Sequence, residues 1–138
     1  MLIIDASNEE RCLLGQGKGR MVKSNFYSAL AGFIDQGESI EEAVRREVQE
    51  ESQVKVGHVQ YHSSQPWPFP SSLMIGCHGL AVSKEIVVNS TEMANVSWFS
   101  REEVIESLNN RHPKLRVPGR MAIANHLIKS WAEGEVQF

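Results

Sequence analysis

Acidic side chains crowd one short stretch of this chain, residues 32–54. Six glutamates lie between positions 38 and 51 and only two arginines oppose them, which leaves an excess of four negative charges: Glu38, Glu41, Glu42, Glu47, Glu50 and Glu51 against Arg45 and Arg46. Carboxylate oxygens are the ligands that hard divalent cations prefer. A cation held this way can neutralise a phosphoanhydride and lower the pKa of a bound water. The simpler alternative is the solvated face of an ordinary amphipathic helix.

Helical spacing helps to decide between a cation site and a solvated helix face. At about 100° per residue, one apolar stripe runs along the stretch: Ile40, Val44 and Val48. Glu47 and Glu51 fall inside this stripe and Glu50 lies at its edge, so two carboxylates face the expected core. Such groups are costly to desolvate unless a cation compensates them. Arg46 precedes Glu50 by four residues, so the two side chains can pair and keep Glu50 charged.

The order of these residues resembles the Nudix box of the Nudix hydrolases. Gly32 is followed after five residues by Glu38, and after seven more by the run REVQEESQV at positions 46–54. Gln53 stands where the pattern has glycine, which would end the helix with a positive φ angle. In that conformation Gln53 would cost on the order of 1 kcal/mol, or the helix ends differently.

The resemblance implies a metal site with Mg²⁺ or Mn²⁺ as cofactor. It places Glu47, Glu50 and Glu51 at the metal and makes Arg46 the residue that orients them; which glutamate acts as the base stays open. It also implies a backbone carbonyl ligand from Ala31 and a glutamate from a later loop. Glu92, just before an expected strand, occupies the matching place, and a solvated turn is its alternative.

A proline-rich segment carries a second resemblance. Residues 64–72 read SQPWPFPSS, which is similar to the SQPWPFPxS signature of the NADH pyrophosphatase branch of the family. Alternating prolines fix φ and remove donors, so we expect a stiff extended loop and not a central strand. A dimer contact or a loop at the edge of the core is the alternative. The branch implies that the segment lines the dinucleotide site: Gln65, Pro66, Trp67, Pro68, Phe69, Pro70, Ser71 and Ser72.

Two further residues match substrate-contacting positions of this branch. Phe33, directly after the box glycine, corresponds to a position that stacks on a base or the nicotinamide ring, although a core phenylalanine is the simpler alternative. Ala124 corresponds to a backbone contact near the C-terminal helix.

The implied activity is metal-dependent hydrolysis of the pyrophosphate bond of NADH, which gives AMP and reduced nicotinamide mononucleotide. NAD⁺ and NAD-capped RNA are further substrates that related enzymes accept. The alternatives are a Nudix hydrolase of ADP-ribose or a deoxynucleoside triphosphate, and a Nudix module that binds a nucleotide without turnover.

The expected elements follow from periodicity and turn residues. We expect a helix from Ser39 to about Ser52, with Ser39 and Glu42 forming a capping box. Further helices are expected at 101–108, with Ser100 as N-cap, and at 121–131. Strands are expected at 1–5, 11–14, 26–31, 54–61, 73–82, 85–89 and 96–99, with a mobile basic loop near Gly15, Gly17 and Gly19. This order indicates an α/β fold, and the resemblance sharpens it to the Nudix α/β/α sandwich with a mixed sheet.

Length and composition set the remaining bounds. The chain has 138 residues, which suits a single Nudix domain (1–138), and 41% of them are hydrophobic. The net charge of −3 argues against nonspecific nucleic-acid binding. No apolar run is long enough to span a membrane, and Cys12 and Cys77 are too few for a disulfide framework.

The expected setting of the domain follows from the start of the chain and from the branch. The chain opens inside an apolar strand-like run, so we expect a fragment of a longer protein whose upstream zinc ribbon and N-terminal domain are missing. Zinc is not expected within this chain, because its five histidines are scattered. We also expect a homodimer, and an intracellular location that is either cytoplasmic or peroxisomal.

Overall fold

Five strands form one mixed sheet in the computed structural model, which describes residues 1–7, 10–68 and 70–138. The strands are β1 (Leu2–Asp5), β2 (Arg11–Gly17), β3 (Val56–Trp67), β4 (Ser72–Ala81) and β5 (Met93–Ser100). Their order across the sheet is β3-β4-β1-β2-β5. Strands β1 and β4 run parallel, and every other neighbouring pair is antiparallel. The expected mixed sheet is therefore confirmed.

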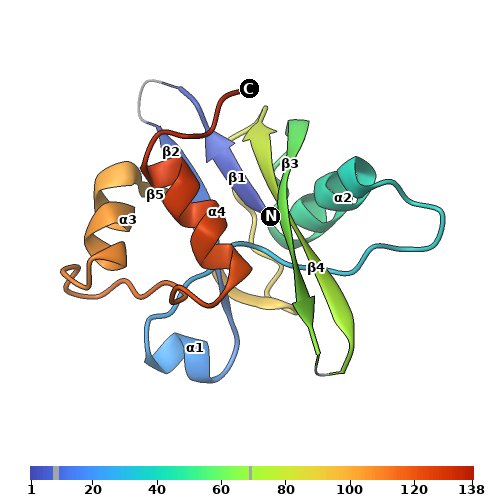
Figure 1. Cartoon of the computed structure of the whole chain (residues 1–138). Coiled ribbons are helices and arrows are strands. Elements are labelled where there is room, and N and C mark those ends of the chain that lie inside the picture. Colours follow the sequence, from blue (N-terminus) through green and yellow to red (C-terminus); the bar gives the residue numbers. More distant parts are fainter. Residues whose placement is uncertain (8–9, 69) are drawn as a thin grey trace.

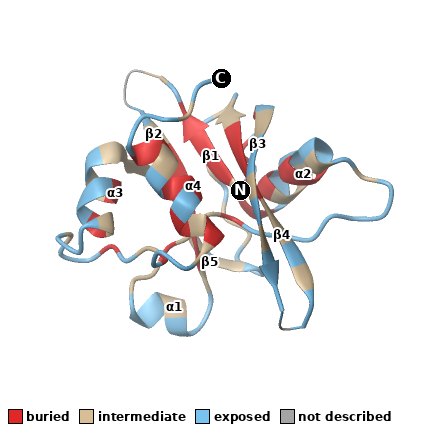
Figure 2. Ribbon diagram, in the orientation of Figure 1, coloured by how far each residue is buried: buried red, intermediate tan, exposed pale blue. Residues whose placement is uncertain are grey.

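Helices cover both faces of this sheet (Figure 1). Helix α2 (Ile40–Ser52) packs on one face, and α3 (Arg101–Leu108) and α4 (Ile123–Ala132) pack on the other. Strand β1 supplies both layers, because its side chains alternate between the faces. Leu2 and Ile4 join the core under α3 and α4, whereas Ile3 joins the core under α2. The buried residues accordingly gather on the central strands β1 and β2 and on the inner sides of the helices (Figure 2). The expected α/β/α sandwich is confirmed.

Helix α2 has the predicted N-cap and ends at the predicted residue, but the predicted capping box of Ser39 and Glu42 is wrong. The hydroxyl of Ser39 accepts a hydrogen bond from the backbone N–H of Glu42 at 3.1 Å, so Ser39 is the N-cap. The complete capping box occurs instead at α3, between Ser100 and Glu103. At the other end, Gln53 adopts the left-handed conformation with a φ of 64°. The chain thus keeps the turn that glycine normally provides, at a cost on the order of 1 kcal/mol.

The proline-rich segment is a strand and not a loop as far as Trp67. Pro66 pairs with Leu73 and Trp67 with Ser72, so residues 63–67 extend β3. Strand β3 lies at the edge of the sheet. An edge strand tolerates proline, because a residue without an N–H group can face solvent there and need not donate to a neighbouring strand. The prediction that this segment is not a central strand is correct, whereas the predicted loop is confined to the turn between β3 and β4.

Three other predicted elements differ from the structure. Residues 85–89 are not a strand, because their N–H groups bond to the C-terminal end of α2: Val87 donates to Ser52 and Asn89 to Glu51. Residues 26–31 form only isolated bridges, at Phe26 and Ser28. Most of the segment predicted to be a glycine-rich loop forms regular secondary structure, since β2 continues to Gly17 and a short helix, α1 (Arg20–Lys23), follows.

No helix among the described residues has the length and apolar character that a membrane span requires.

Candidate active site

The carboxyl group of Glu51 is buried in the last turn of α2. Its residue is 6% exposed, and its Oε2 atom has no hydrogen-bond partner. Burial, followed by repulsion from Glu47 and Glu92, raises the pKa of Glu51 to about 7. A buried carboxylate among other carboxylates is unfavourable without a compensating charge. The prediction that Glu51 faces the interior is confirmed, and its orphaned oxygen is the kind of ligand that a hard cation takes.

Arg46 connects three of the surrounding acids. Its Nε atom lies 2.7 Å from Glu38, and Nη1 lies 2.9 Å from Glu47 and 3.3 Å from Glu50. Its Nη2 atom also donates to the carbonyl of Phe33 at 2.9 Å. The expected pair with Glu50 is present, but the bonds to Glu38 and Glu47 are shorter. Arg46 therefore fixes the loop before α2 and the carboxylates on α2 at the same time.

Glu47 is held between Arg46 and the backbone at Gly32. Its side chain is 15% exposed, which confirms that it also faces inward. A Cβ atom at position 32 would overlap the carboxyl group of Glu47. Only glycine lets the chain pass this closely, so Gly32 brings the backbone next to the acidic cluster. Ala31, whose carbonyl is a predicted ligand, is the preceding residue in this loop.

The turn that carries Glu92 is attached to the end of α2. Asn89 donates its N–H to the carbonyl of Glu51 at 3.0 Å, and Glu92 donates to the carbonyl of Asn89 at 3.1 Å. These bonds place Glu92 near enough to contribute to the raised pKa of Glu51. Glu92 itself is exposed, which is compatible both with a metal ligand and with a solvated turn residue.

The carboxylates do not converge into a finished ligand shell. Within residues 1–7, 10–68 and 70–138, no three His, Cys, Asp or Glu side chains are placed to hold a metal ion. Glu47 is paired with Arg46, and Glu50 is half exposed. The buried, unpartnered oxygen of Glu51 and its acidic neighbours nevertheless fit a divalent cation, because oxygen donors of negative charge are what such an ion binds.

The proline-bearing strand is fastened to the beginning of α4. The side-chain amide of Gln65 donates to the carbonyl of Met121 at 2.7 Å and accepts from the N–H of Ile123 at 3.0 Å. Ala124 lies one residue further, in the first turn of α4. Two predicted substrate-contacting regions are thus brought together, but the amide of Gln65 is committed to α4 and not to the glutamates.

Several predicted substrate-contacting residues are open to solvent. Phe33 is 82% exposed and Trp67 is 50% exposed, which excludes the interpretation of Phe33 as a core residue. The other described members of the proline-rich segment are exposed or half-buried: Pro66, Pro68, Pro70, Ser71 and Ser72. Phe69 lies outside the described residues.

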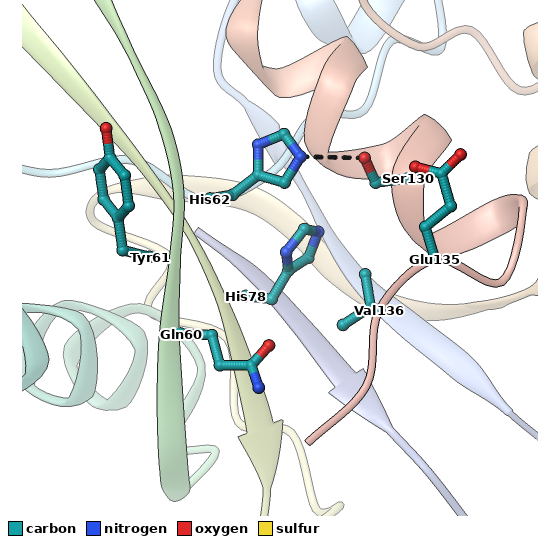
Figure 3. Close-up of a pocket in the computed structure, with 7 residues that line it drawn as sticks. All are labelled: Gln60, Tyr61, His62, His78, Ser130, Glu135 and Val136. Atoms are coloured by element: carbon teal, nitrogen blue, oxygen red, sulfur yellow. Dashed lines mark hydrogen bonds between the residues drawn. The ribbon is translucent and has the colours of Figure 1, made fainter.

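Two hollows of the described surface lie away from α2. One of about 240 Å³ lies between β3, β4 and the C-terminal segment, where His62 bonds Ser130 at 3.0 Å (Figure 3). The other, of about 420 Å³, borders the loop before α4 and includes Arg120 and Asn125. Neither includes a glutamate of α2, so the acidic cluster and not a deep pocket defines the candidate site.

Sequence reasoning missed the part that Glu38 plays. Glu38 binds Arg46 through both carboxyl oxygens and accepts the N–H of Asp35 at 3.0 Å. The guanidinium of Arg46 lowers the pKa of Glu38 to about 2. The spacing of the box already contained Glu38, but periodicity within the helix could not show that this residue, outside the helix, pairs with Arg46. The contact between the rings of His62 and His78 was likewise invisible, because it joins two strands.

The fold, the glycine-bearing loop and the inward glutamates together define one family. The family model of the NUDIX domain matches residues 1–117, and this chain belongs to the Nudix family.

Curated relatives point to one branch of that family. The chain is 55% identical over 122 residues to the "NAD-capped RNA hydrolase NUDT12" of Macaca fascicularis, which covers 88% of the chain and 26% of that protein. It is 43% identical to the human "NAD(P)H pyrophosphatase NUDT13, mitochondrial", covering 92% of the chain and 39% of that protein. It is 40% identical to the "NAD-capped RNA hydrolase NudC" of Mycobacterium bovis, covering 90% and 44%. The chain thus spans less than half the length of these relatives.

Solved structures agree on the fold. A Nudix-family hydrolase from Clostridium perfringens matches with a TM-score of 0.64 at 18% identity, covering 94% of this chain and 93% of that one. The Nudix domain of Shewanella oneidensis NrtR, complexed with ADP ribose, matches with a TM-score of 0.68 at 16% identity, covering 96% and 82%.

Proposed function

We propose that this domain hydrolyses the pyrophosphate bond of NADH, giving AMP and reduced nicotinamide mononucleotide. NAD⁺ and the NAD cap of RNA are further substrates of the same site. One structural observation supports the chemistry most directly: the buried carboxyl group of Glu51, with an unpartnered oxygen, among Glu47, Glu50 and Glu92. The activities after which the relatives are named support the choice of the dinucleotide.

The residues that would hold Mg²⁺ or Mn²⁺ are Glu47, Glu50, Glu51 and Glu92 together with the carbonyl of Ala31. When bound, the cation supplies charge neutralisation for the pyrophosphate and a more acidic water. Glu50 is half exposed and lies beside Arg46, so it can accept a proton from an attacking water. Arg46 orients the carboxylates of Glu47 and Glu50 through its ion pairs with both.

The aromatic residues complete the proposal. Phe33 lies in the loop that Arg46 fixes and is exposed, so its ring is available to stack on a base. Trp67 is half exposed on the strand that Gln65 fastens to α4. We also propose that the protein is a homodimer, in which the exposed edge around Trp67 is the contact. Of the compartments expected, cytoplasm and peroxisome stay predictions, and one relative is named as mitochondrial.

The test is release of AMP from NADH, followed by chromatography with Mg²⁺, with Mn²⁺ and with a chelator. We expect turnover only with a divalent ion, and we expect Glu50→Gln to lower kcat by about 100-fold or more, as loss of a general base does. Glu106→Gln, an exposed glutamate on α3, is the control. Turnover that survives Glu50→Gln unchanged would contradict the assigned role, and a panel with ADP-ribose and deoxynucleoside triphosphates tests the substrate class.

A further inference from the structure

Positive charge is concentrated in two segments of this acidic chain. Seven of the 14 lysines and arginines lie in residues 16–26 and 109–122, and neither segment contains an acidic residue. The seven form what we call the basic surface: Lys18, Arg20, Lys23, Arg111, Lys114, Arg116 and Arg120. Because all 17 acidic residues lie elsewhere, the two segments carry seven positive charges while the rest of the chain carries an excess of ten negative ones.

The two segments lie side by side although they are about 90 residues apart in sequence. Tyr27 donates its N–H to the carbonyl of Arg116 at 2.8 Å, and Arg116 donates to the carbonyl of Asn25 at 3.2 Å. Phe26 forms a parallel bridge with Arg116. The loop that leads into α4 accordingly passes next to α1 at one end of the molecule (Figure 1).

The seven cationic side chains are available to a partner. All seven residues are exposed. In the part of the chain that the structure describes, no ion pair involves any of them. Arg116 donates from Nη1 to the carbonyls of His112 and Leu115, but these neutral groups do not cancel its positive charge. Cations that form no ion pair attract anions from solution, and their combined field exceeds that of a single charge.

The basic surface borders the candidate active site at two places. Gly17, next to Lys18, pairs with Met93, which directly follows Glu92. At the other end, Arg120 precedes Met121, whose carbonyl accepts the amide of Gln65. The cations therefore extend from the turn of Glu92 to the strand that carries Trp67.

We propose that the basic surface binds the phosphodiester backbone of single-stranded RNA whose 5′ cap occupies the acidic site. This inference rests on the proposed function. The adenosine half of an NAD cap continues into the RNA chain, so a capped substrate leaves the site as a polyanion, whereas free NADH does not. Lysines and arginines that neutralise successive phosphates provide binding that depends on salt and not on sequence. The net charge of −3 conceals this capacity, because the opposite charges lie on different parts of the molecule.

A membrane surface fits the same charges less well. Helix α1 has only four residues, too few for an amphipathic helix that inserts an apolar face into lipid. The polar, proline-bearing segment 109–120 offers no second such helix.

The six lysines of the chain provide a matched experiment. Three lie on the basic surface and three lie elsewhere, so a triple Lys→Gln variant at 18, 23 and 114 changes the net charge as much as one at 55, 84 and 129. We measure kcat/KM for NADH and for an NAD-capped single-stranded RNA, each over a range of salt concentrations. Direct binding of a fluorescent, uncapped RNA oligonucleotide is measured in parallel without metal.

We expect the first variant to keep its activity on NADH and to lose about ten-fold or more in kcat/KM for capped RNA. Its salt dependence should fall by about 2 in the logarithmic slope, since each neutralised phosphate contributes about 0.7 for a single strand. The second variant should match the unsubstituted protein.

Three outcomes would overturn the proposal. The two triple variants could lose the same amount of kcat/KM for capped RNA, or the variant at 18, 23 and 114 could bind the oligonucleotide as well as the unsubstituted protein does. In the third, the variant at 18, 23 and 114 loses binding to anionic phospholipid vesicles only and keeps its binding to RNA. Failure of the proposed function looks different, because the unsubstituted protein would then hydrolyse neither substrate. The oligonucleotide binding would still show whether the surface takes RNA.

Discussion

Gly32 and Glu47 occupy complementary space: the carboxyl group of Glu47 lies where a side chain at position 32 would have to be. One residue without a side chain therefore lets the loop of Ala31 approach α2 at the point where an inward-facing glutamate emerges. The same glutamate is paired with Arg46 at 2.9 Å, so the backbone approach and the ion pair fix a single position for its carboxylate.

Gly32→Ala should therefore impair the site more than it impairs the fold. The added methyl group must displace Glu47 or the loop, which typically costs about 1–3 kcal/mol. We expect kcat for NADH to fall at least about ten-fold while the protein remains folded, measured by steady-state turnover and thermal unfolding. Gly119→Ala is the matched control, because no atom lies within 4 Å of a Cβ at that position. Equal activity of the two variants would show that the position of Glu47 does not matter.

The local pattern of α2 could be predicted because it depends on neighbours within the same helix. The N-cap at Ser39, the inward direction of Glu47 and Glu51 and the residue at which the helix ends all follow from spacing. Gln53 shows that the turn after the helix is kept even without glycine. Here the surrounding structure outweighs the backbone preference of a single residue.

Features that depend on distant partners could not be predicted in this way. The sequence predicts a strand at residues 85–89, but the N–H groups of Val87 and Asn89 donate to the carbonyls at the C-terminal end of α2. The alternating prolines predict a loop, but part of the segment belongs to β3, an edge strand, which tolerates proline. The basic surface was hidden because a net charge averages over the chain, whereas binding depends on which segments the fold places together.

The pair of Glu38 and Arg46 should make stability depend on acid pH. Arg46 lowers the pKa of Glu38 to about 2 in the folded state, below its ordinary value near 4.5. The stabilisation is therefore fully present above about pH 4.5 and is lost as the pH falls toward 2. We expect Glu38→Gln to be less stable than the unsubstituted protein at pH 7 and the difference to shrink between pH 4.5 and 2, as followed by chemical denaturation at several pH values.

A control separates this pair from general acid denaturation. Glu106→Gln removes an exposed glutamate of α3 that forms no ion pair with any of the described residues. Its stability difference from the unsubstituted protein should stay small and nearly independent of pH. A Glu38→Gln difference that persists below pH 3 would contradict the ion-pair explanation.

Glu51→Gln should stabilise the metal-free protein and remove its response to metal. The carboxylate is buried with an unpartnered oxygen beside other acids, so an uncharged side chain of the same shape relieves repulsion and desolvation. Without divalent ions at pH 8, we expect a Tm higher by a few degrees, roughly what 1 kcal/mol gives for a domain of this size. Added Mg²⁺ or Mn²⁺ should raise the Tm of the unsubstituted protein, because ligands that bind only the folded state stabilise it, and should raise that of the variant much less.

This comparison does not depend on turnover. If the cation raises both Tm values equally, Glu51 is not a ligand and its burial needs another explanation. Glu102→Gln, a solvent-exposed substitution in α3, controls for the loss of one negative charge and should leave the effect of the cation intact.

Gln65 should act by positioning the edge strand against α4. Its amide makes two hydrogen bonds to the backbone at Met121 and Ile123, so it connects the strand of Trp67 with the first turn that contains Ala124. In Gln65→Glu the carboxylate still accepts from Ile123, at a helix N-terminus that favours negative charge, but it no longer donates to Met121. In Gln65→Ala both bonds are lost, at about 0.5–1.5 kcal/mol each.

We therefore expect a graded effect on NADH hydrolysis, with KM raised more by Gln65→Ala than by Gln65→Glu and kcat changed little, since neither variant touches the glutamates of α2. Hydrogen exchange at the Ile123 amide should accelerate in Gln65→Ala and stay slow in Gln65→Glu, because only the latter keeps an acceptor for it. If Gln65 instead contacts the dinucleotide directly, the two variants should raise KM without any change in that exchange rate. An accelerated amide together with a raised KM in Gln65→Ala alone identifies the residue as one that holds the binding strand in place.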